Sequence, residues 1–150
     1  MQGWLALEDG TVVHGRPFGA VGTVEGELVF NTSMTGYQEA LTDPSYAGQL
    51  LMFTFPQIGN YGCHPDWMES SGAQVRACIV RECCRAPHQG QQTLDEWLQA
   101  ENIPGLEGID TRTLTIRTRE AGTLRAVLCS DGSLEPEASM LARVVAGSSR

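Results

Sequence analysis

The residue with the clearest chemical potential in this sequence is Ser45, within the segment Asp43-Pro44-Ser45-Tyr46. Proline at the second position predicts a turn, and the residue before a proline is driven toward extended backbone. A serine hydroxyl can both donate and accept a hydrogen bond, so a rigid turn could present it to a ligand. Alternatively, the hydroxyl bonds the backbone of its own turn, as serines in such turns commonly do. The residues alone leave both interpretations open.

A second candidate is the adjacent pair Cys63-His64, a thiol beside an imidazole. A thiol enzyme would use Cys63 as nucleophile and His14 or His64 as base, but such groups assemble in space rather than along the chain. Because no second pair has metal-ligand spacing, we predict no metal site. The alternative for the cysteines is that they are small, buried or half-buried hydrophobic residues. The five are Cys63, Cys78, Cys83, Cys84 and Cys129.

Composition excludes several classes of function. The chain has 150 residues, a net charge of −8 and 41% hydrophobic residues, which is typical of one globular domain. Its ten basic residues are all arginines and are scattered, which argues against a nucleic-acid partner. Without lysine there is neither a Walker A loop nor a pyridoxal Schiff base. The sequence lacks an apolar run of membrane-spanning length and a signal peptide, so we expect a cytoplasmic protein without a membrane partner.

The elements that would position Ser45 are mainly strands, with helices following later in the chain. The run 49–55 is almost continuously apolar, which is typical of a strand covered on both faces. A hairpin turn is predicted at Asp9-Gly10. Strands are predicted over residues 4–7, 11–15, 28–30, 49–55, 73–82 and 123–130. In the fifth of these, we expect Val75, Ala77 and Ile79 on one face and Arg76, Cys78 and Val80 on the other.

Helices are predicted around these strands. A short helix over 37–41 would lead into the Ser45 turn, and a Gly-rich loop over 55–62 would follow the buried strand. Gly122 should end a helix that begins near residue 110. A last short helix follows Pro136, before a flexible tail. The predicted capping residues are Thr35 with Gln38, Thr93 with Glu96, and Asp110; the apolar face of the helix after Thr93 is Leu94, Trp97 and Leu98.

Several segments resemble, in this order, one known family. They are "LEDGTVVHGRPFG", "GELVFNTSMTGYQEALTDPSYAGQ", "FPQIGNYG", "ESSGAQVRACIVRE" and "GIDTRTLT", and the similarity runs from about Leu7 to Leu128. The family is the N-terminal domain of the small (glutamine amidotransferase) chain of carbamoyl phosphate synthase. The resemblance implies an α/β fold of the swivelling β/β/α type, with a mixed sheet, a second small sheet and helices. It also implies a domain over 1–135, followed over 136–150 by a short helix and a flexible tail leading to an amidotransferase domain.

The resemblance also implies a role for Ser45. In such enzymes the small chain hydrolyses glutamine, and the large chain makes carbamoyl phosphate from ammonia, bicarbonate and ATP for pyrimidine and arginine biosynthesis. The serine of the D-P-S-Y loop reaches across the domain junction and hydrogen-bonds the glutamine. One departure from the family lies in the helix after Asp110, where Arg117 and Thr118 stand at positions that normally help an apolar face.

The same resemblance sets the expected partners and limits. None of the five cysteines lies in a G-x-C-x-G elbow, so the Cys-His-Glu triad is absent and we expect no catalytic residue and no activity of the domain alone. No cofactor is expected here, because ATP and Mg belong to the large subunit. The expected partners are the amidotransferase domain, the large subunit and glutamine. The alternative is a non-catalytic interaction module without substrate contact, in which Ser45 would be buried in its own turn.

Overall fold

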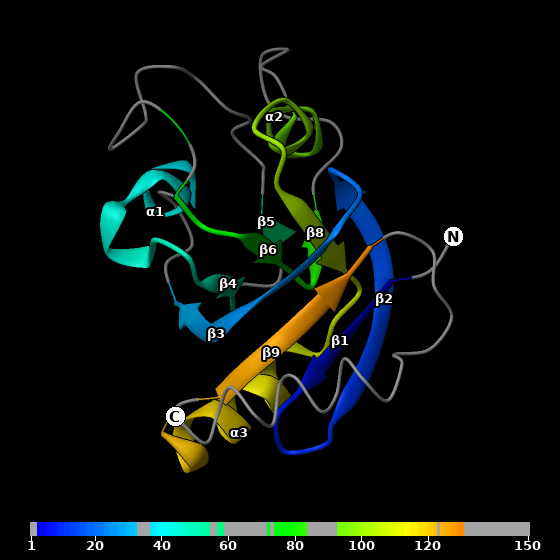
Figure 1. Ribbon diagram of the computed structural model, residues 1–150, viewed down its shortest axis with the longest axis vertical. Helices are drawn as coiled ribbons and strands as arrows, with labels where there is room; N and C mark the ends of the chain where they lie inside the picture. Colours follow the sequence, from blue (N-terminus) through cyan, green and yellow to red (C-terminus); the bar gives the residue numbers. More distant parts are fainter. Residues whose placement is uncertain are drawn as a thin grey trace.

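The computed structural model describes residues 3–32, 37–54, 57–58, 72, 74–83, 93–122 and 124–130. Within this part of the chain, strands close into a barrel in the order β1-β2-β8-β6-β4-β3-β9 (Figure 1). Strands β5 and β7 pair in a separate sheet. The strands are β1 (Gly3–Leu7), β2 (Val12–Gly19), β3 (Thr23–Asn31), β4 (Leu50–Phe53), β5 (Gln57–Ile58), β6 (Ala77–Ile79), β7 (Glu82–Cys83), β8 (Pro104–Glu107) and β9 (Leu124–Cys129). The helices are α1 (Tyr37–Thr42), the 3₁₀ turn η1 (Pro44–Tyr46), α2 (Leu94–Ala100) and α3 (Thr111–Ala121).

The barrel mixes parallel and antiparallel pairs. Strands β3, β4, β6 and β8 run parallel as neighbours, whereas β1, β2 and β9 pair antiparallel. The predicted α/β class, with a mixed sheet, a second small sheet and helices, is confirmed. Because parallel neighbours end at the same edge, the residues that follow β3, β4 and β6 come together at one end of the barrel.

Strand β4 explains why the run over 49–55 is almost continuously apolar and does not alternate between apolar and polar residues. Leu50 and Met52 pack inside the barrel, and Leu51 and Phe53 pack outside it in a second cluster beneath α1 and α2. All four side chains are fully buried. The prediction of a strand covered on both faces is therefore confirmed, and each face contributes to a different core.

The strand predicted over 73–82 is shorter than expected. Regular pairing covers only Ala77–Ile79, and Glu82–Cys83 belongs to the second sheet. Val75 was expected beside Ala77 and Ile79, and this was wrong: it packs in the outer cluster together with Cys78 and Val80. The alternation fails because Val75 precedes the first paired residue, where the chain bends rather than continuing the pleat.

The predicted helix boundaries are confirmed where the structure describes them. Thr93 accepts a hydrogen bond from the Glu96 N–H at 3.1 Å, and its own N–H donates to Glu96 Oε1 at 3.1 Å, a complete capping box. Asp110 accepts from the Thr113 N–H at 3.2 Å, and Gly122 ends α3 with φ +85°. The predicted apolar face of α2 is buried; it consists of Leu94, Trp97 and Leu98.

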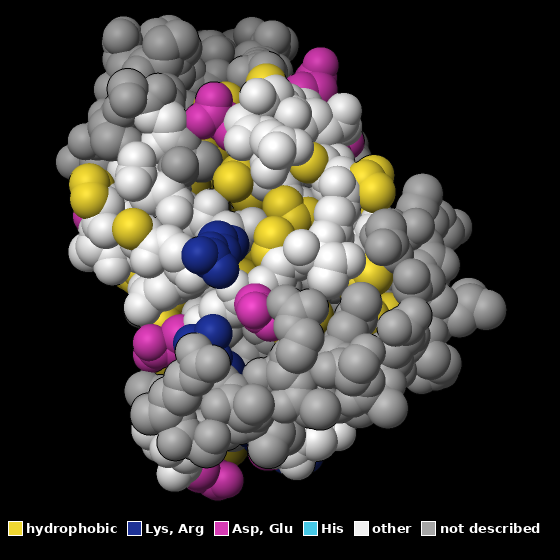
Figure 2. Space-filling view, viewed as in Figure 1, with side chains coloured by type: hydrophobic (Ala, Val, Ile, Leu, Met, Phe, Trp, Pro, Cys, Tyr) yellow, Lys and Arg dark blue, Asp and Glu magenta, His cyan; other side chains and the backbone are white. Residues whose placement is uncertain are grey.

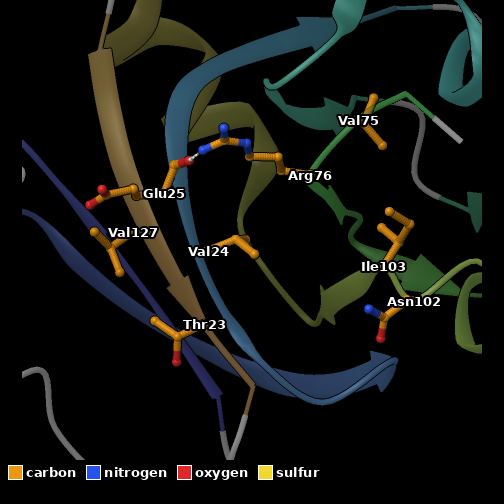
Figure 3. Close-up of a pocket in the computed structure, with 8 residues that line it drawn as sticks. All are labelled: Thr23, Val24, Glu25, Val75, Arg76, Asn102, Ile103 and Val127. Carbon is orange, nitrogen blue, oxygen red and sulfur yellow. Dashed lines mark hydrogen bonds between the residues drawn. The ribbon is translucent and has the colours of Figure 1, made fainter.

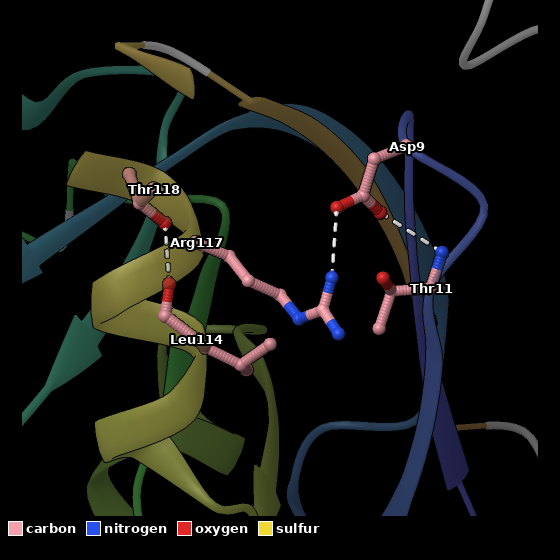
Figure 4. A network of polar contacts seen from close by, with 5 residues as sticks. All are labelled: Asp9, Thr11, Leu114, Arg117 and Thr118. Carbon is pink, nitrogen blue, oxygen red and sulfur yellow. Dashed lines mark hydrogen bonds and ion pairs between the residues drawn. The ribbon is translucent and has the colours of Figure 1, made fainter. Parts of the chain in front are cut away.

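Helix α3 packs against the barrel despite the unusual Arg117 and Thr118 (Figure 4). The buried Thr118 hydroxyl donates to the Leu114 carbonyl at 2.8 Å, so the helix itself satisfies it. Arg117 pairs with Asp9 in the β1–β2 turn at 3.5 Å. Burial raises the pKa of Asp9, but hydrogen bonds from Thr11 and the Arg117 charge outweigh it and the pKa is lowered.

Some expectations fall outside the described residues. These include the Thr35 cap, most of the loop over 55–62, the helix after Pro136 and the proposed tail over 136–150. Cys78, Cys83 and Cys129 are buried, in agreement with the hydrophobic interpretation of the cysteines. In the described part of the chain, no helix combines the length and the apolar character needed to cross a membrane.

Candidate functional site

The turn that carries Ser45 is built by Asp43 and Pro44. Asp43 adopts extended backbone at φ −72° and ψ 122°, as expected before proline, and its carboxylate accepts the Ser45 N–H at 2.9 Å. Pro44 occupies the first turn of η1, where its missing N–H is not needed. The Tyr46 and Ala47 N–H groups then donate to the Asp43 and Pro44 carbonyls at 3.0 and 3.1 Å. The side chain that closes this turn is therefore that of Asp43.

The turn is also tied to the barrel by its backbone. The Gly48 N–H donates to the Gln74 carbonyl at 3.2 Å, and the Gln49 carbonyl accepts the Arg76 N–H at 2.9 Å. On the other side, the Gln74 N–H donates to the Leu41 carbonyl at 2.9 Å. Hydrogen bonds on both flanks hold the Ser45 turn in place, so a ligand would not have to order it.

Ser45 itself is exposed at the surface of this fixed turn. Its N–H is bound by Asp43, and among the described residues its hydroxyl makes no hydrogen bond. Whether Ser45 contacts a substrate, or belongs to an interaction module without substrate contact, stays a prediction. An exposed hydroxyl on a hydrogen-bonded turn can donate to or accept from a group presented by another molecule or domain.

A groove of about 570 Å³ is lined by Val75 and Arg76 (Figure 3), which belong to the segment that is hydrogen-bonded to Gly48 and Gln49 after the turn. Arg76 lies at its edge and donates from Nη1 to the Glu25 carbonyl at 2.8 Å. Its floor contains the buried side chains of Val75, Ile103 and Val127. On the face drawn in Figure 2, hydrophobic side chains gather in a hollowed region with cationic and acidic side chains at its margin. Such a mixture of apolar floor and polar rim suits contact with another protein surface.

The groove could not be predicted from the sequence, because its residues come from four separate segments. Thr23, Val24 and Glu25 lie on β3, and Val127 lies on the neighbouring strand β9. Asn102, which follows α2, has φ +62°, an uncommon conformation for a residue other than glycine. No spacing along the chain indicates such a surface, because strand pairing and the crossover connections create it.

The other predicted site residues are less informative. Cys63 and His64 lie outside the described residues, and His14 is exposed on β2. In the part of the chain that the structure describes, no group of three or more metal-ligating side chains is present. The absence of a metal site and of a cofactor therefore stays a prediction, and so does the ligand contact of Ser45.

Comparison with known proteins identifies the family. The family model for the carbamoyl-phosphate synthase small chain, CPSase domain, matches residues 5–128. The chain belongs to this family. The carbamoyl phosphate synthase small chain of Methanosarcina acetivorans is 50% identical over 145 residues, which cover 95% of this chain and 39% of that protein. The one from Methanopyrus kandleri is 53% identical over 130 residues, covering 85% of this chain and 36% of that protein.

The match is therefore to one part of longer relatives. The carbamoyl phosphate synthase small chain of Streptococcus mutans shows the same proportion, 51% identity over 85% of this chain and 36% of its own length. Among solved structures, an aminopeptidase from Aneurinibacillus sp. strain AM-1 has a TM-score of 0.49 at 16% identity, over 85% of this chain and 30% of that one. A similarity at that level carries no inference about function. This chain spans less than two fifths of the length of the small chains that it matches.

Proposed function

We propose that this chain is the N-terminal domain of the small subunit of a glutamine-hydrolysing carbamoyl phosphate synthase. In this role it docks a glutaminase domain onto the synthetase large subunit and helps bind glutamine through Ser45. The Cys-His-Glu triad resides in the amidotransferase domain, and ATP and Mg are handled by the large subunit. The family membership supports the assignment to the small chain, and the exposed Ser45 hydroxyl on its fixed turn carries the proposed glutamine contact.

The chemistry of the contact follows from the hydroxyl. Glutamine presents an ammonium group, a carboxylate and an amide, and a serine hydroxyl can donate to the oxygens or accept from the N–H groups. Because Asp43 already occupies the Ser45 N–H, the hydroxyl is the remaining hydrogen-bond donor of that residue. One neutral hydrogen bond contributes about 1 kcal/mol net, so Ser45 would tune glutamine affinity rather than create it. The isolated domain would accordingly neither hold nor hydrolyse glutamine.

The docking part of the proposal draws support from the groove beside the turn. Its floor of Val75, Ile103 and Val127 and its rim of Arg76 and Glu25 form a surface on which a neighbouring domain can pack. A domain packed there would lie next to Ser45, since the backbone of the turn is hydrogen-bonded to the segment containing Arg76. The groove thus supports a junction at which Ser45 could reach a substrate held mainly by the other domain.

The decisive experiment is Ser45→Ala in the intact enzyme. We expect KM for glutamine to rise roughly twofold to tenfold, the equivalent of one net hydrogen bond, while ammonia-dependent synthesis is unchanged. Ser45→Thr keeps a hydroxyl and should retain most of the glutamine affinity. An equal fall in both activities would contradict the assigned role. A glutamine KM that is unaltered in Ser45→Ala, with the complex still assembled, would instead favour the interaction module without substrate contact.

A further inference from the structure

A second hollow, of about 480 Å³, lies at the far end of strand β4 from the Ser45 turn. Ser45 precedes the first residue of β4, whereas Thr54 follows its last residue, so the two surfaces flank opposite ends of one strand. The hollow forms where the carboxyl ends of the parallel strands β3, β4 and β6 meet α3. The lining residues that matter here are Thr54, Arg81, Thr111, Arg112, Ile116 and Arg119.

The hollow brings together arginines that are scattered along the sequence. Arg112 and Arg119 are separated by about two helical turns and so share one face of α3, and Arg81 reaches the same hollow from the end of β6. Within the described residues, none of the three belongs to an ion pair. The chain as a whole has a net charge of −8, so this is a local basic surface on an acidic protein.

One acidic side chain, Asp110, interacts with the charge of Arg81 and so offsets part of the positive charge of the hollow. Asp110 is occupied at the N-terminus of α3, where its carboxylate accepts from the Thr113 N–H at 3.2 Å and from the Thr113 hydroxyl at 2.8 Å. These bonds lower its pKa, and the Arg81 charge lowers it further. The guanidinium of Arg119 lies 5.3 Å from the centre of the Phe30 ring, which orients it while leaving its N–H groups available.

An exposed apolar side chain distinguishes the hollow from an ordinary solvated charge cluster. Ile116, at 49% exposure, is one of two large hydrophobic side chains described as exposed, and it lies among the arginines. Arginine beside exposed apolar surface is typical of protein interfaces.

We propose that this Arg-lined hollow docks an acidic segment of the synthetase large subunit, with carboxylates on the arginines and an apolar side chain against Ile116. The inference rests on the proposed function, in which the glutaminase domain packs at the Ser45 end of β4 and leaves the opposite end for the other partner. Arginine forks bind carboxylates through paired N–H groups, which gives such a contact direction as well as charge. The open basic rim does not suit a small substrate, which needs a more enclosed and apolar pocket.

The test measures the affinity of this chain for the synthetase large subunit of the same organism by isothermal titration calorimetry. We expect Arg112→Ala and Arg119→Ala each to weaken binding roughly tenfold, as for interface hot spots. Arg117→Ala is the matched control, because it removes the same charge from the same helix on the flank that faces Asp9. It should change affinity less than roughly twofold. Unchanged thermal unfolding of all three variants verifies that they fold.

The other outcomes separate the hypotheses. Equal weakening by all three variants would mean general electrostatic attraction and would overturn the docking site. Normal binding by Arg112→Ala and Arg119→Ala would also overturn it, while leaving the proposed function intact. If the unaltered chain does not bind the large subunit, both the docking role and this inference fail. A titration with inorganic phosphate alone gives a further check: phosphate binding that depends on Arg112, with large-subunit affinity independent of it, would assign the hollow to a small anion instead.

Discussion

Gly26→Ala tests whether the Ser45 turn is as closely seated on the barrel as its hydrogen bonds indicate. A methyl group at Gly26, on β3, would lie 2.6 Å from the Gly48 carbonyl oxygen, well inside the 3.4 Å at which ordinary contacts begin. The obstacle is backbone rather than a flexible side chain, so β3 or the segment after η1 must move. That movement would strain the bond from the Gly48 N–H to the Gln74 carbonyl.

The expected cost follows from these contacts. Overpacking costs about 1–3 kcal/mol, and alanine recovers about 0.4–1 kcal/mol by restricting the unfolded chain. We therefore expect a net loss of about 1–2 kcal/mol, seen as a fall in Tm of about 2–8 °C for a protein of this size. Thermal unfolding followed by circular dichroism, with urea unfolding as an independent measure, gives both quantities.

Gly22→Ala is the matched control. A methyl group there meets nothing within 4 Å and the backbone is not left-handed, so stability should be unchanged or slightly raised. If Gly26→Ala is as stable as Gly22→Ala, the seating of the turn is looser than described and the rigid presentation of Ser45 is refuted. In the intact enzyme, Gly26→Ala should also raise KM for glutamine, because it moves the turn that carries Ser45.

Two further predictions concern stability. Asp110→Ala removes the N-cap of α3 and should cost about 1 kcal/mol at pH 7, measured by urea unfolding. The pKa of Asp110 in the folded protein is lowered from 3.8, so its contribution to stability is complete above that pH and is lost as the pH falls through the lowered pKa. The difference in unfolding free energy between the variant and the unaltered chain should therefore shrink in acid. A difference that does not depend on pH would contradict a cap that depends on the carboxylate charge. Phe53→Ala should lower the free energy of unfolding by about 3–5 kcal/mol, because its fully buried ring fills the outer core. The control Val21→Ala, at a side chain that is 66% exposed, should lower it by less than about 0.5 kcal/mol. Similar losses in the two variants would refute the burial assigned to β4.

Local features of this chain could be read directly from the sequence. The Thr93–Glu96 capping box, the Asp110 cap and the Gly122 stop are confirmed, because each depends on side chains only a few residues away. The buried strand β4 is confirmed because an uninterrupted apolar run is stable only when both faces are covered. The predicted face of Val75 was wrong because it depends on more than local sequence. Alternation of side chains holds only within a continuous strand, and the strands that pair with it decide where a strand ends.

The candidate site also combines features that the sequence predicts with features that depend on the tertiary structure. The sequence by itself determined the turn at Asp43-Pro44 and singled out Ser45, since proline restricts its own backbone and that of its neighbour whatever the surroundings. Only the tertiary structure decided that the Ser45 side chain faces outward, that a groove lies beside it, and that Arg81 joins Arg112 and Arg119 in one hollow. Closure of the barrel and the parallel alignment of β3, β4 and β6 bring these distant residues together, and such pairings depend on contacts that local sequence cannot specify.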